Sequence, residues 1–161
     1  MTISIRIPSH PKDGRTWLSD RDLGVSSLDT PELHRIFKAY LEPFAELAPL
    51  HERVLVVLHG LPTAIQRDLF EDSRFRIALD DFVPNAGRTV WLACPAPGGN
   101  GSRCVVLKPR LADCPETFAH YVIAHELAHA YFRQGGWGDV TDPEDAADAL
   151  AASWGFPHPA M

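Results

Sequence analysis

Cysteine is scarce in this 161-residue chain, which holds Cys94, Cys104 and Cys114 and no others. No two of them form the Cys-x-x-Cys pair that many structural zinc sites use. An odd number of cysteines also disfavours a framework of disulfides. We therefore expect buried free thiols, with a pairing of Cys94 and Cys104 across a hairpin as the alternative.

Long apolar runs are missing as well. The longest run, residues 54–58, is far too short to cross a bilayer. Residues 1–15 lack the continuous apolar stretch of a signal peptide. We therefore expect a cytoplasmic protein that does not contact a membrane.

Positive charge is not in excess either. The formal net charge is −6, and no dense run of lysine and arginine occurs. A nucleic-acid partner is therefore not expected, because binding phosphates requires a basic field. With 45% hydrophobic and 22% charged residues, the composition is typical of one ordinary globular domain.

The first half of the chain predicts an irregular lead-in followed by helices. Residues 1–28 are polar, contain prolines and glycines and show no clear period, so we expect an extended segment. Residues 29–50 are predicted to be helical, because residues 30–32 (Thr-Pro-Glu) are typical of a helix start and apolar residues follow at helical spacing. Residues 54–58 fit either a buried strand or a buried helix, and a short helix is expected to begin near residue 61.

The second half predicts strands and then two helices. Residues 75–79 alternate between apolar and polar, which favours a half-buried strand. Two more strands are expected at residues 88–94 and 103–108, joined as an antiparallel hairpin. Helices should follow at residues 115–133 and 143–153.

The motif His-Glu-x-x-His at residues 125–129 lies within the helix predicted at residues 115–133. His125 and His129 are four residues apart, so both imidazoles lie on one helix face and can bind one Zn²⁺ at roughly 2.0–2.1 Å. Glu126 lies beside them, placed to take a proton from the attacking water rather than to bind the ion. The motif therefore predicts two zinc ligands and a general base.

The surroundings of Glu126 support this interpretation. From residue 117 to residue 132 it is the only Asp, Glu, Lys or Arg, and apolar residues occupy nearly every side of the predicted helix. Such a helix is expected to be buried, and a buried carboxylate is costly unless another group compensates it. The alternative is a core helix whose histidines bond to the backbone.

Catalytic zinc takes three protein ligands and keeps a fourth position for water. Glu144 is the best third candidate, with Asp148 on the same helix face to accept the spare N–H of a ligating histidine. Thr141 and Glu144 could instead form a capping box. Asp142 as the cap, with Pro143 at the first helical position, fits the proline better and leaves Glu144 free.

Other residues are also candidates for the site. His158 could replace Glu144 as a ligand, although it lies between two prolines. Three acidic residues are further alternatives: Asp139, Asp142 and Asp145. Amide hydrolysis also benefits from a donor that stabilises the oxyanion, and the candidates for it are Tyr121, Tyr131, Arg133 and His158. The strand at residues 103–108 could pair with a substrate backbone or be an ordinary core strand.

This combination resembles the gluzincin metallopeptidases, in which His-Glu-x-x-His is followed by Glu-x-x-x-Asp. The pattern at residues 144–151 is similar to that of the membrane CAAX-type proteases, although their transmembrane helices are absent. A downstream glutamate on an alanine-rich helix also resembles the soluble ImmA/IrrE regulatory proteases. The resemblance covers residues 121–153. It implies a zincin-like fold, in which an edge strand before the metal helix holds a peptide extended.

Together these features predict a single zincin-like α+β domain over residues 1–161, with its core at residues 51–161 and the metal site at residues 121–153. A small, mainly antiparallel sheet should pack on the metal-binding helix, and a second helix should carry Glu144. The expected function is zinc-dependent hydrolysis of a peptide or protein substrate. Two alternatives stay open: a catalytically silent or regulatory zinc-binding module, and a metal-dependent amidohydrolase that acts on a small substrate. No pattern sets the oligomeric state.

Overall fold

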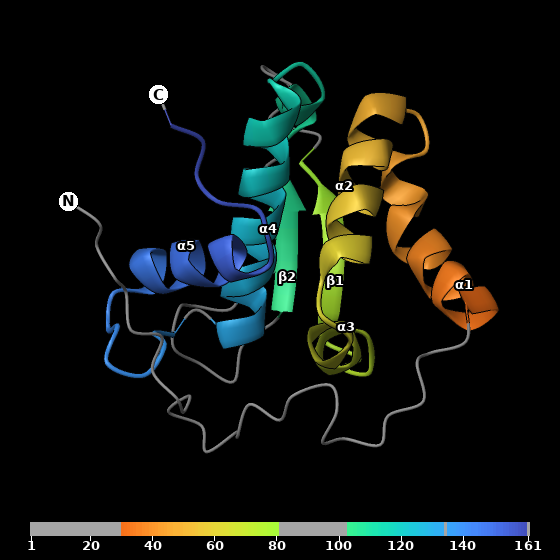
Figure 1. Cartoon of the computed structure of the whole chain (residues 1–161). Helices are drawn as coiled ribbons and strands as arrows, with labels where there is room; N and C mark the ends of the chain where they lie inside the picture. The colour runs from red at the N-terminus through yellow and green to blue at the C-terminus, as the bar shows by residue number, and fades with distance from the viewer. Residues whose placement is uncertain (1–29, 81–102, 134, 161) are drawn as a thin grey trace, which may run out of the picture.

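The computed structural model describes residues 30–80, 103–133 and 135–160 (Figure 1). The lead-in expected at residues 1–28 and the strand expected at residues 88–94 lie outside these ranges. The described chain mixes helices and strands, as its sequence predicts, and none of these helices has the length and apolar character to cross a membrane. The elements are α1 (Thr30–Leu41), η1 (Glu42–Phe44), α2 (Ala48–Gly60), α3 (Thr63–Phe70), β1 (Phe75–Leu79), β2 (Arg103–Leu107), η2 (Pro109–Ala112), α4 (Glu116–Phe132) and α5 (Pro143–Ser153).

Two prolines divide the helical region that was predicted at residues 29–50. α1 ends at Leu41, Pro43 lies in the short 3₁₀ turn η1, and Pro49 lies in the first turn of α2. Proline is tolerated in a first turn because the N–H that it lacks has no partner within the helix there. α1 packs on α2 and buries Phe37.

The apolar run at residues 54–58 belongs to α2 and is not a strand. Val54, Val57 and Leu58 are buried, whereas Val56 is 45% exposed. This spacing follows one face of a helix, since a half-buried strand would bury alternate residues. The choice that periodicity left open is therefore decided in favour of a helix.

β1 and β2 form a two-stranded parallel sheet in which Ile77 lies opposite Val105 (Figure 1). This differs from the mainly antiparallel sheet that we predicted. The prediction paired residues 103–108 with the nearest preceding candidate, residues 88–94, which lie outside the described ranges. β2 pairs instead with β1, and residues 80–102 are long enough for the crossover that parallel strands require.

α4 lies at the centre of the described structure, packed on α5 at one side and on β2 and α2 at the other (Figure 1). Both α4 and α5 bury small side chains, among them Ala124 and Ala128 of α4 and Ala147 and Ala151 of α5. Side chains of this size allow two helix axes to approach closely. The two helices that carry the predicted ligands are therefore direct neighbours.

The side chain of Arg103 is buried at the start of β2, with 1% of its surface exposed. Its guanidinium donates to the carboxylates of Asp68 in α3 and of Asp72, which precedes β1. It also donates to the backbone carbonyls of Ala130 and Tyr131 in the last turn of α4. Carbonyls in the last turn of a helix lack the usual partner four residues on, and a cation near a helix C-terminus is favourable. The Ala130 carbonyl also accepts a hydrogen bond from the backbone N–H of Arg133, which caps α4. One side chain thus joins α3, the sheet and α4.

We expect Arg103→Met to lower the free energy of unfolding by about 3–5 kcal/mol, because it removes the buried cation that bonds the Asp68 and Asp72 carboxylates and the end of α4. Urea unfolding followed by circular dichroism measures the change. Arg35→Met is the matched control, because the ion pair that Arg35 forms with Glu32 is exposed. It should stay within about 0.5 kcal/mol of the parent protein. Equal losses in the two variants would contradict the role given to Arg103.

Candidate metal centre

His125 and His129 lie one turn apart on α4, and their rings converge. Their Nε2 atoms are 3.0 Å apart, and their ring centroids are 4.6 Å apart. The side chain of His129 is 7% exposed and that of His125 is 13% exposed. The two nitrogens therefore face one point at the boundary between the core and the surface.

Glu144 reaches the same point from the first turn of α5. One of its carboxylate oxygens lies 3.1 Å from His125 Nε2, and the other lies 3.3 Å from His129 Nε2. Unlike the two histidines, Glu144 is largely exposed, at 72% of its side chain. The group therefore has two ligand candidates anchored in the core and a third that approaches from solvent.

The start of α5 explains where Glu144 lies. Asp142 is the N-cap, and its carboxylate accepts hydrogen bonds from the backbone N–H groups of Glu144 and Asp145. Pro143 occupies the first turn. Of the two caps that the sequence left open, Asp142 is the one that forms, and the Glu144 carboxylate is free to approach the histidines.

The spacing of the three donor atoms suits a tetrahedral metal ion. All three lie within 4.8 Å of one another. Two ligands at about 2.05 Å from a tetrahedral ion are roughly 3.3 Å apart. The two Nε2 atoms are 3.0 Å apart, and each lies 3.1 or 3.3 Å from a different oxygen of the Glu144 carboxylate. Two imidazole nitrogens and one carboxylate form a donor set that catalytic zinc sites use, with a fourth position open. These residues therefore fit Zn²⁺.

Asp148 lies one turn after Glu144 on α5 and holds the ring of His125. His125 Nδ1 donates to Asp148 Oδ1 over 2.8 Å, because a carboxylate can only accept. The ring proton is then on Nδ1, which leaves the lone pair of Nε2 for an ion. His129 differs, because its Nδ1 is buried and has no hydrogen-bond partner within the described ranges.

Tyr121 supports Asp148, a role that we did not predict from the sequence. Its hydroxyl donates to Asp148 Oδ1 over 2.7 Å. Burial, followed by the hydrogen bond to the Asp148 carboxylate, raises the pKa of the Tyr121 hydroxyl, which therefore stays protonated as a donor. The sequence alone indicates Tyr121 only as a candidate oxyanion donor. Its spacing of four residues from His125 was the signal that places it on this face.

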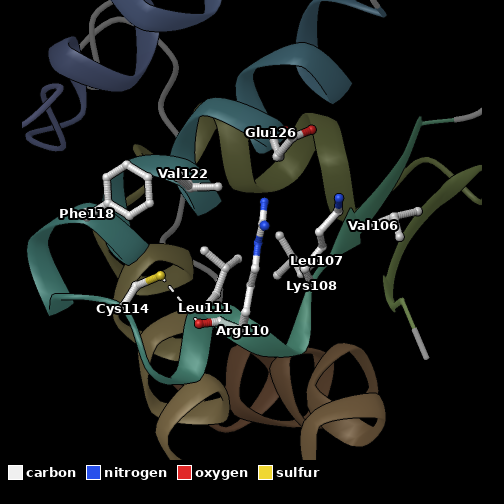
Figure 2. A pocket seen from close by; sticks show the side chains of 9 residues that line it. All are labelled: Val106, Leu107, Lys108, Arg110, Leu111, Cys114, Phe118, Val122 and Glu126. Atoms are coloured by element: carbon white, nitrogen blue, oxygen red, sulfur yellow. Dashed lines mark hydrogen bonds between the residues drawn. The ribbon is translucent and has the colours of Figure 1, made fainter. Parts of the chain in front are cut away.

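Glu126 is outside the donor group and lines a neighbouring cavity of about 560 Å³ (Figure 2). The cavity lies between α4, the end of β2 and η2. The composition of α4 predicts a helix that is buried on nearly every side, and this prediction is wrong for one face. On that face Phe118 is 37% exposed, and Val122 and Glu126 are half-buried. A molecule in the cavity can reach the Glu126 carboxylate.

The other ligand candidates lie outside the three-residue group. Asp142 caps α5, and Asp139 and Asp145 are exposed. His158 is exposed too, and its ring packs against that of Tyr121 with 4.6 Å between the centroids. None of these four belongs to the metal-binding group found within the described ranges.

Two of the oxyanion candidates take part in the network around Arg103. The backbone carbonyl of Tyr131 accepts a hydrogen bond from Arg103. Arg133 is the left-handed residue that ends α4, and its guanidinium lies 3.9 Å from the Asp72 carboxylate. The Arg133 side chain is therefore part of this structural network, as is the backbone of Tyr131.

Comparisons of the chain with models of known protein families, with curated proteins and with solved structures found no match. Function is therefore inferred from the chemistry of the residues described above.

We expect Asp148→Asn to lower the affinity for Zn²⁺ by about 10- to 100-fold, because it weakens the hydrogen bond that orients His125. Competition with a chromophoric chelator measures the dissociation constant. Asp145→Asn is the matched control, since Asp145 is an exposed acid on the same helix outside the donor group. An equal effect of both substitutions would show that overall charge, and not the contact with His125, determines the affinity.

Proposed function

We propose that this chain is a zinc-dependent peptidase with a zincin-like site. His125, His129 and Glu144 hold the ion, Glu126 acts as the general base and Asp148 positions His125. The observation that carries the proposal is the convergence of three donor atoms, from two helices, at the spacing of a tetrahedral site. A core helix with satisfied histidines would not need a carboxylate from a second helix.

The hydrogen bonds behind the donors support a metal-binding role. Histidines that bind metals commonly donate their second ring N–H to a carboxylate. The His125–Asp148 contact has this form, and the Tyr121 hydroxyl donates to the same carboxylate oxygen. Two helices are thus joined by a chain of polar contacts that orients one ligand candidate.

Glu126 performs the proton transfers in this proposal. When bound, Zn²⁺ supplies Lewis acidity, which polarises a substrate carbonyl and lowers the pKa of water. Glu126 takes the proton of the attacking water and delivers it to the amine as the C–N bond breaks. Its position next to His125, with access to the cavity, suits this role.

β2 is the strand on which a peptide is proposed to lie. It packs on α4, and its Val106 and Leu107 line the cavity beside Glu126. An extended peptide can add to a strand through backbone hydrogen bonds. The order of strand, turn and metal helix along the chain agrees with the zincin likeness, although β2 is parallel to β1.

We expect Glu126→Gln to reduce peptide hydrolysis by about 10²–10⁴-fold, because glutamine cannot accept the proton. Zinc content should stay at the level of the parent protein, since Glu126 is outside the donor group. Cleavage of an unfolded protein is followed by mass spectrometry, and zinc is measured by atomic absorption. Glu116→Gln, an exposed position in the first turn of α4, is the control and should cleave like the parent.

The same measurements separate the proposal from its two alternatives. A Glu126→Gln variant that cleaves as fast as the parent would exclude the mechanism. Zinc at one ion per chain, with no cleavage of any substrate, would favour a zinc-binding module. Hydrolysis of small amides but of no peptide would favour an amidohydrolase.

A further inference from the structure

Apolar side chains make up most of the lining of the cavity beside Glu126. One wall is the face of α4 that presents Phe118, Val122 and Glu126 at intervals of four residues. The opposite wall includes Leu107 at the end of β2 and Leu111 in η2 (Figure 2). A space of about 560 Å³ with this lining accepts a bulky apolar group.

Two cationic side chains lie at the same cavity. Lys108 follows β2 and Arg110 lies in η2, and both are exposed. Figure 2 shows both side chains extending toward Glu126. Neither residue forms an ion pair with another residue of the described ranges. The chain as a whole has a formal net charge of −6, whereas these two positive side chains outnumber the one acidic residue, Glu126, that lines the cavity.

The backbone that carries the two cations is held in place. Arg53 of α2 donates a hydrogen bond to the carbonyl of Leu111, and the Leu111 side chain is buried. Pro109 fixes the backbone between Lys108 and Arg110. The backbone positions of Lys108 and Arg110 are therefore fixed at the edge of the cavity that Glu126 also lines.

We propose that the cavity selects peptides that carry a bulky apolar side chain and a carboxylate close to the cleaved bond. This inference rests on the proposed function, because it places that bond beside Glu126. The apolar side chain fills the space between α4 and η2, and the carboxylate binds Arg110 and Lys108. Arginine binds a carboxylate through two parallel hydrogen bonds, and lysine adds a point charge.

The carboxylate can belong to an aspartate or glutamate side chain or to the C-terminus of the peptide. Both sources offer the same two oxygens to Arg110. Four peptides of otherwise identical sequence distinguish the two sources. Each has either glutamate or glutamine near the apolar residue, and each ends in either a free carboxylate or an amide. A fifth peptide has alanine in place of the apolar residue.

Two measurements are made on the zinc-loaded full chain. The first is kcat/KM for each peptide, and the second is peptide binding to Glu126→Gln by fluorescence anisotropy, which requires no turnover. We expect at least one source of carboxylate to improve both values by about tenfold or more over the glutamine amide, as a charge-assisted hydrogen bond would. The alanine peptide should lose about tenfold or more relative to its bulky counterpart.

In the variant Lys108→Gln/Arg110→Gln, acidic and neutral peptides should have nearly equal kcat/KM values and nearly equal affinities, so the ratio of each value between the two kinds of peptide should be close to one. Arg35→Gln/Lys38→Gln removes the same charge from exposed positions of α1 that do not line this cavity, and it should preserve the ratio. Added salt should lower the ratio in the parent protein, because the contact is exposed.

The outcomes separate this inference from the proposed function. Peptide cleavage without preference for a carboxylate, or a preference that survives loss of both cations, would overturn the inference and leave the peptidase proposal intact. The inference would also be overturned if the alanine peptide bound as tightly as the peptide with the bulky apolar residue. Carboxylate-dependent binding that the double variant abolishes, with no cleavage of any peptide, would support the contact and overturn the peptidase proposal.

Discussion

The buried guanidinium of Arg103 is the contact on which the described structure depends. Burying a charge is costly, and here the carboxylates of Asp68 and Asp72 offset that cost. Asp72 stays ionised because hydrogen bonds, first from Arg74 and also from Arg103, hold its pKa well below the ordinary value. The same guanidinium binds the carbonyls that follow His129 at the end of α4. The contact that joins α4 to the sheet therefore also sets the position of one histidine.

The second requirement of the metal centre is the register of α5. Each residue of a helix is rotated by about 100° from the one before it. If α5 began one residue earlier or later, Glu144 and Asp148 would both turn away from His125. The Asp142 cap and Pro143 fix that starting point. The cap at the start of α5 thus decides whether the two histidines of α4 meet a carboxylate.

Signals contained within a few neighbouring residues predicted the parts of the site. The bounds of α4 and α5, and the Asp142 cap, follow from helical periods and from proline placement. Residues 54–58 could not be assigned, because a short apolar run has no readable period. The parallel pairing and the partners of Arg103 were missed, since those partners lie 27 to 35 residues away and no local pattern records them. The geometry brings Glu144 to the histidines, and its role as a zinc ligand stays a prediction.

Because the three donor atoms come from two helices, an ion bound by all of them would act as a cross-link between α4 and α5. An ion that binds the folded chain and not the unfolded one adds its binding free energy to that of folding. At a free concentration one hundred times the dissociation constant, this linkage amounts to about 2.7 kcal/mol. Removing the ion would therefore withdraw stability first from the contact between α5 and α4. The stability of the contact between α5 and α4 would then depend on the free concentration of the metal ion as well as on the side chains that pack there.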